Sequence, residues 1–178
     1  MEHPTAFLPT QAFLAPHTSA IPARCIDDYR VEVEVVIDTG EAVLLVRPFS
    51  GTLFQNPIWS VPKGVVGIDE LPEQAALRIA RESTNLLLEV THPAILGTRI
   101  VTTQHDGQCI YRLVYTYALG VLRDERGEML TRFKLGDTYL WHQWLPHESQ
   151  DILEMQYDTL DTDLRAIIAR FIGSPTAC

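Results

Sequence analysis

The sequence has few of the features that mark secreted, membrane or nucleic-acid-binding proteins. Its 178 residues include only three cysteines, Cys25, Cys109 and Cys178, and no CxxC pair. Neither a disulfide framework nor a zinc knuckle is therefore indicated, and we expect reduced thiols in a cytoplasmic protein. No stretch approaches the roughly 18 consecutive apolar residues that span a bilayer, so we expect no membrane partner.

Basic residues are also scarce. The chain has 14 Lys and Arg against 23 Asp and Glu, which gives a formal net charge of −9. This charge opposes the phosphate backbone of nucleic acids, so non-specific binding of DNA or RNA is not expected. Hydrophobic residues make up 46% of the chain, which is enough to bury a core and excludes disorder throughout.

Composition divides the chain into three parts. Residues 1–28 are rich in proline and contain the apolar pairs Phe7-Leu8 and Phe13-Leu14. We expect an extended arm that packs these pairs on the domain or on a second subunit, which would make a homodimer. A floppy leader is the alternative. Residues 29–173 are expected to form one domain, followed by a C-terminal tail at 174–178.

Hydrophobic periodicity in the domain predicts several strands and two helices. Strands are expected at 31–37, 41–46, 59–61, 94–103, 109–119 and 139–145. Two pairs of them, 31–46 and 94–119, are expected to be hairpins because turn residues separate their halves. Helices are expected at 73–88, where no proline or glycine interrupts good helix formers, and at 160–172, where apolar residues share one face.

The stretch 59–86 combines a Pro-Lys-Gly turn, a short loop and the first helix. Gly64 is followed after five residues by Glu70, and after seven more by Arg78. This spacing resembles the box of the Nudix family, G-x5-E-x7-R-E-U-x-E-E-x-G-U, in which U is a bulky aliphatic residue. The resemblance covers about residues 29–173. It implies the Nudix fold, an α+β fold in which a mixed β-sheet lies between helices (α/β/α).

The resemblance also implies a chemistry, the metal-dependent attack of water on a pyrophosphate linked to a nucleoside or a similar group. It assigns catalytic roles to Glu82, Glu70 and Arg78, and the two glutamates could hold one Mg²⁺ or Mn²⁺ ion. Magnesium often binds only one or two protein carboxylates, while water and substrate phosphates complete its octahedron. The resemblance further places Lys63 and Gly64 near the ligand.

Three arginines on strands or at strand ends could meet phosphate as bidentate donors, namely Arg47, Arg99 and Arg112. Ordinary surface charge is the alternative for each of them. Several aromatic residues could stack a base, although alternating strand positions more often belong to a core. These residues are Trp59, Tyr115, Tyr117, Trp141 and Trp144.

The box departs from the family pattern at decisive positions. The family has carboxylates one, four and five residues after the arginine, which places them on one helix face. Here those residues are Ile79, Glu82 and Ser83, so two of the three carboxylates are absent. Core packing would explain the two replacements, and Arg78 with Glu82 could form a simple ion pair along the helix. Asn85 replaces the glycine that ends the helix, and Asn also tolerates a left-handed cap.

These departures leave three functional hypotheses. The first is a Nudix domain that binds a nucleoside-diphosphate-like or other diphosphate ligand, with hydrolysis weakened or lost. The second is a divergent, active hydrolase in which other groups supplement Glu82 and Glu70. The candidates are the carboxylates Asp69, Glu73, Asp124, Glu125, Glu128 and Asp137, with His105 or His142 as a base. The third is a pocket reassigned to other biosynthetic chemistry, such as isomerisation or cyclisation.

Overall fold

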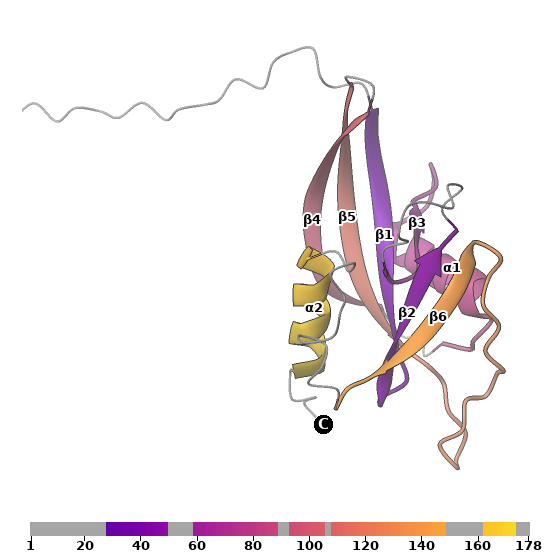
Figure 1. The fold of residues 1–178 in the computed structure, drawn as a ribbon. Helices are drawn as coiled ribbons and strands as arrows, with labels where there is room; N and C mark the ends of the chain where they lie inside the picture. The colour runs from indigo at the N-terminus through magenta and orange to yellow at the C-terminus, as the bar shows by residue number, and fades with distance from the viewer. Residues whose placement is uncertain (1–27, 50–58, 89–92, 106–107, 149–161, 174–178) are drawn as a thin grey trace, which may run out of the picture.

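The computed structural model describes residues 28–49, 59–88, 93–105, 108–148 and 162–173. The predicted N-terminal arm, most of the loop after β2 and the C-terminal tail lie outside the described residues. A mixed sheet lies between two helices, α1 (Pro72–Thr84) and α2 (Thr162–Gly173) (Figure 1). This arrangement confirms the predicted α+β class. Among the described residues, no helix is long and apolar enough to cross a membrane.

The sheet has six strands, of which five follow the order β4-β5-β1-β2-β6, while β3 pairs with β1. The central pair β1–β5 is parallel, and the other pairs are antiparallel. The predicted hairpin of β4 and β5 is confirmed from Ala94↔Ala118 to His105↔Gln108. The strands are β1 (Asp28–Asp38), β2 (Ala42–Pro48), β3 (Lys63–Val65), β4 (Ala94–His105), β5 (Gln108–Gly120) and β6 (Tyr139–Pro146).

The predicted hairpin at 31–46 is confirmed, because β1 and β2 pair antiparallel, but their pairing is confined to the turn. Asp38 accepts a 2.8 Å hydrogen bond from the Gly40 N–H, and Gly40 has a φ of 82°. Beyond Asp38↔Val43, however, β1 and β2 are not paired with each other. The segment 60–66 lies between them: β3 pairs with β1, and Ser60 forms a bridge with Val46. Turn residues reverse the chain but do not decide what the strands pair with afterwards.

Each face of the sheet has its own core, because side chains alternate along the strands. On one face, the odd-numbered β1 residues Val33, Val35 and Ile37 pack in a cluster with Ala76 and Ile79 of α1. On the other face, even-numbered Val36 joins a cluster with side chains of α2, including Leu164 and Ile168. The two helices therefore cover opposite faces, and any residue of β1 can be assigned to a face by its parity.

Helix α1 ends earlier than the predicted 73–88. Asn85 adopts the left-handed conformation, with a φ of 52°, and its N–H donates to the Arg81 carbonyl at 2.9 Å. Asn thus provides the cap that the sequence predicted for this position. Leu86 and Leu88 follow the cap and are buried, so their apolar character reflects the core and not further helix.

Candidate functional site

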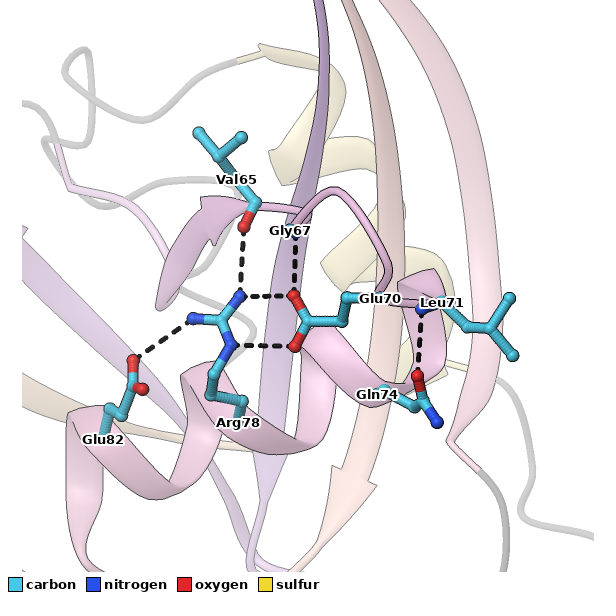
Figure 2. Close-up of polar contacts among 7 residues, drawn as sticks. All are labelled: Val65, Gly67, Glu70, Leu71, Gln74, Arg78 and Glu82. Atoms are coloured by element: carbon cyan, nitrogen blue, oxygen red, sulfur yellow. Dashed lines mark hydrogen bonds and ion pairs between the residues drawn. The ribbon is translucent and has the colours of Figure 1, made fainter.

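An arginine of α1 holds the loop that precedes this helix. Arg78 Nε and Nη2 donate to the two carboxylate oxygens of Glu70 at 2.8 and 2.7 Å, and Nη2 also donates to the Val65 carbonyl at 3.1 Å (Figure 2). The Gly67 N–H donates to Glu70 Oε2 at 2.9 Å. Both oxygens of Glu70 are therefore engaged in fixing the loop, a bidentate arrangement that also fixes the orientation of the guanidinium.

These bonds determine the protonation of the pair. The hydrogen bonds from Arg78 and from the Gly67 N–H lower the pKa of Glu70 from 4.5 to about 2. The same pairing raises the pKa of Arg78 further above its already high ordinary value. Glu70 is consequently an ionised acceptor at neutral pH and is not poised to donate a proton.

The residue after Arg78 belongs to the core. Ile79 is 3% exposed and packs in the cluster between α1 and the sheet. A Cβ added at Gly64 of β3 would lie 3.1 Å from both Cδ1 and Cγ1 of Ile79. Gly64 thus allows close approach between β3 and the helix at the position where the family has its first carboxylate. The structure explains this box glycine by packing against an apolar side chain.

Segment 134–136 covers the last turn of α1. The Gly136 N–H donates to the Ser83 carbonyl at 2.8 Å, and the Lys134 N–H donates to the Thr84 carbonyl at 3.0 Å. These bonds satisfy carbonyl groups that a helix end leaves without partners. A Cβ at Gly136 would lie only 2.7 Å from the Glu82 carbonyl oxygen, and Ser83 is 5% exposed. The sequence showed Gly136 only as a glycine in a charged loop, so its contact with the helix was missed.

Glu82 is the remaining carboxylate of this helix face. Its side chain is 63% exposed, and one oxygen accepts a 3.3 Å hydrogen bond from Arg78 Nη1. The predicted ion pair between residues four apart is therefore present. Figure 2 shows Arg78 between Glu82 and Glu70, so a single guanidinium contacts both predicted metal ligands.

The donor set does not fit the several-carboxylate metal site that the resemblance implied. Ile79 and Ser83 are buried and offer no carboxylate, and the oxygens of Glu70 are already bonded. Glu82 is left as the box carboxylate that is open to solvent. Within the part of the chain that the structure describes, no group of three or more His, Cys, Asp or Glu residues could hold a metal ion.

The carboxylates outside the box have different surroundings. Asp124 stabilises its own turn, because its Oδ1 accepts the N–H groups of Arg126 and Glu128, each at 2.8 Å. Burial and the neighbouring Glu73 raise the pKa of Tyr117 to about 12. Asp137 is exposed and directly follows the glycine that contacts α1, so it is the loop carboxylate placed beside the helix end. Asp69, Glu125 and Glu128 are exposed in loops.

Two of the predicted phosphate-binding arginines are already paired with glutamates of β1. Arg99 donates to the two oxygens of Glu34 at 2.8 Å each, and the Arg99 side chain is only 13% exposed. Arg112 is 3.4 Å from Glu32. Both glutamates are even-numbered residues of β1, so these pairs lie on the face opposite α1. The structure does not bring them together with Glu82.

The other two predicted basic residues lie on that same face. Lys63 is directly opposite Glu34 in the β1–β3 register, and its side chain is exposed. The Arg47 guanidinium stacks 4.6 Å from the ring centre of Trp59, whose side chain packs on the α2-side core. Four basic residues thus share one face of the sheet, and two of them have carboxylate partners there.

The remaining predicted side chains are mostly packed against neighbours. His142 and Trp144 contact Phe133, with ring centres 4.6 and 5.6 Å away. Tyr115 and Tyr117 stack on each other at 6.4 Å, while Trp141 is exposed. The His105 side chain lies outside the described part of the structure. The roles of these residues as bases or as surfaces for base stacking therefore stay predictions.

The chain is an α/β/α sandwich whose first helix is tied to its leading loop by the Arg78–Glu70 pair. The NUDIX domain family matches residues 28–169. The chain therefore belongs to the NUDIX family, as the box predicted. A comparison with curated protein sequences found no match.

Solved structures of NUDIX proteins are similar in fold. The MutT protein from Methanosarcina mazei Go1 is 23% identical with a TM-score of 0.54, over 82% of this chain and 94% of that one. A NUDIX hydrolase from Nitrosomonas europaea is 18% identical with a TM-score of 0.57, over 81% and 88%. A bifunctional NMN adenylyltransferase/ADP ribose pyrophosphatase from Francisella tularensis, complexed with AMP and Mn, is 16% identical with a TM-score of 0.53 over 80% and 41%. At these identities the likeness concerns the fold alone.

Proposed function

We propose that this NUDIX protein binds a nucleoside-diphosphate-like or other diphosphate ligand and has weak or no pyrophosphohydrolase activity. The observation that carries the proposal is the state of the three helix positions after Arg78. Ile79 is packed against Gly64, Ser83 is covered by the segment that contains Gly136, and Glu82 is engaged with Arg78. Water activation by a divalent ion needs oxygen ligands, and these positions supply one carboxylate.

The family and one fold relative support the proposed ligand class. The Francisella tularensis protein of similar fold is described as complexed with AMP and Mn, which makes adenine nucleotides the first ligands to test. Lys63 is the basic candidate most available to a phosphate, because it is exposed on β3. Arg99 and Arg112 would have to give up Glu34 and Glu32 to bind phosphate, and leaving a buried carboxylate without its partner is costly.

The direct test measures binding and turnover in the same preparation. ADP and inorganic pyrophosphate are titrated by calorimetry with EDTA and then with Mg²⁺ or Mn²⁺, and product is followed by chromatography. We expect binding in EDTA and no turnover with either metal. Lys63→Ala should weaken ADP binding by roughly tenfold, the loss of one charge-assisted contact. Lys134→Ala, which removes the other lysine of the chain, is the matched control and should bind normally.

Two outcomes would contradict the proposal. If neither ADP nor inorganic pyrophosphate binds, the proposed ligand class is wrong. Metal-dependent turnover that Glu82→Gln abolishes would instead support the active divergent hydrolase. Asp137→Asn would then show whether the carboxylate beside the helix end supplies a further ligand, with Asp124→Asn as the control for a carboxylate that acts within its own turn.

A further inference from the structure

An open groove of about 440 Å³ lies between the start of β1 and the loop that leads into α1. Its walls are mainly apolar and include Tyr29, Val31, Val65, Ile68, Pro72 and Tyr115, while Arg30 and Glu70 are its charged lining residues. Tyr29 is 63% exposed, and Ile68 is fully exposed. Large apolar side chains gathered around one concave surface indicate a contact site, because isolated exposed residues would need no such arrangement.

The groove is poorly equipped to recognise a small polar ligand. Small-molecule sites combine apolar walls with a few converging polar groups that are free to bind. The charged residues that line this groove are Arg30 and Glu70. Both oxygens of Glu70 already accept bonds from Arg78 and from the Gly67 N–H, and Arg30 is itself engaged in an interaction. An apolar occupant matches the walls better than a nucleotide or a metal ion.

The chain supplies such an occupant at the edge of the groove. Residues 1–27 precede β1, whose second residue, Tyr29, is a wall of the groove. They contain the pairs Phe7-Leu8 and Phe13-Leu14 but only three charged residues, Glu2, Arg24 and Asp27. The apolar pairs therefore lie close in sequence to an apolar surface that is open in the described structure.

The length of this segment permits the contact. Leu14 precedes Asp28 by 14 residues, and an extended chain spans about 3.3 Å per residue, so this stretch can reach roughly 45 Å. Proline residues at positions 16 and 22 restrict the backbone and reduce the entropy lost on docking. Because the segment is tethered beside the groove, its effective concentration there exceeds that of a second copy at ordinary protein concentrations.

We propose that the groove binds the N-terminal segment of the same chain, with a Phe-Leu pair of residues 7–14 inserted beside Tyr29, Ile68 and Pro72. This contact would cover apolar surface near the Glu70 loop. It is independent of ligand binding and of hydrolysis, because none of these side chains is proposed to bind the diphosphate.

Photocrosslinking of the full chain tests the contact. The photoreactive residue p-benzoylphenylalanine replaces Phe7 or Phe13. The covalent monomer and dimer are separated after irradiation, and the cross-linked peptides of each are identified by mass spectrometry. We expect cross-links to peptides that contain residues 29–31 or 65–72. The matched control places the same residue at Phe49, which is exposed at the end of β2, and should not label these peptides.

A groove variant makes the test specific. Ile68→Asp changes a fully exposed side chain and should leave the fold intact, but it places a charge in the apolar groove. We expect it to reduce the cross-link yield by roughly fivefold, the effect of losing one apolar contact. The proposal is overturned if the yield is unchanged, if both positions label the protein no more selectively than Phe49, or if all cross-links join two chains.

Discussion

The stretch 59–86, which contains the box, has two halves whose side chains have different contacts. In the first half, Glu70 and Arg78 form a partly exposed polar network that ties loop to helix. In the second half, Ile79 and Ser83 are buried, one against a glycine of β3 and the other under segment 134–136. The difference shows that the residues that shape the loop and those that would hold a metal are separable. The contacts that shape the loop therefore do not depend on carboxylates at positions 79 and 83.

Introducing the family's carboxylate at position 79, in the second half, should have the largest effect on stability. Ile79→Glu places a carboxylate beside Gly64, in a cluster of apolar side chains. We expect the free energy of unfolding to fall by roughly 3–5 kcal/mol at neutral pH, as for a buried charge without a partner. The measurement is urea unfolding, with Ile79→Val as the control at roughly 0.5–1.5 kcal/mol.

The pH dependence of this variant identifies the cause. Burial raises the folded-state pKa of a carboxyl group, so the ionisation penalty grows as the pH rises above the unfolded-state pKa and is complete above the folded-state pKa. The penalty should therefore shrink as the pH falls from about 8 to about 5. A penalty that is the same at both values would point to lost packing alone. The result also decides whether activity can be restored by Ile79→Glu with Ser83→Glu. If the first substitution unfolds the protein, the double variant does not test whether the two carboxylates bind metal.

Displacing segment 134–136 from the end of α1 should have an intermediate effect on stability. In Gly136→Ala, the new Cβ would lie 2.7 Å from the Glu82 carbonyl oxygen, so segment 134–136 must move away from α1. We expect a loss of roughly 1–3 kcal/mol in urea unfolding, the range for overpacking. Amide hydrogen exchange should increase for residues 134–136.

Gly173→Ala is the matched control for this substitution. A Cβ at Gly173 has no neighbour within 4 Å in the described structure, and the residue ends α2. Its stability should change by less than about 0.5 kcal/mol. If Gly136→Ala also leaves the stability unchanged, then segment 134–136 does not hold the end of α1.

The sequence predicted the fold well because its signals there are local and redundant. The alternation of β1 indicated a strand, the residues around Gly40 indicated a turn and the box spacing indicated the family, while the β4–β5 hairpin pairs as expected. The pairing of β1 with β3 was not predictable from periodicity. It depends on which strand fills the space between β1 and β2, and tertiary packing decides this.

The candidate site was predictable only in part. Spacing indicated the Arg78–Glu82 pair, since residues four apart on a helix are neighbours. It could not show that Arg78 binds both oxygens of Glu70, or that Arg99 and Arg112 are paired with Glu34 and Glu32 across strands. The two cross-strand pairs join residues far apart in sequence, and the Arg78–Glu70 pair depends on the path of the loop before α1, so periodicity alone predicts none of them.

Removing the charge of Glu70, in the first half, should have the smallest effect on stability, and this effect should depend on pH. The pKa of Glu70 is about 2 in the fold and 4.5 ordinarily. Its ionised form therefore stabilises the fold fully above about pH 4.5, and this contribution is lost as the pH falls toward 2. Glu70→Gln lacks that charge, so its urea midpoint should lie modestly below that of the wild type at neutral pH, because solvent screens partly exposed ion pairs. The two curves should draw together as the pH falls below about 4.5.

The control for this comparison is Glu82→Gln, which alters the more exposed and longer contact to Arg78. Its urea midpoint should follow that of the wild type at every pH, because a single solvent-exposed ion pair contributes little. Parallel curves for Glu70→Gln and the wild type across the acidic range would show that the Glu70 charge does not hold the loop. The contrast between the two halves would then rest on Ile79 and Ser83 alone, since their burial does not depend on that charge.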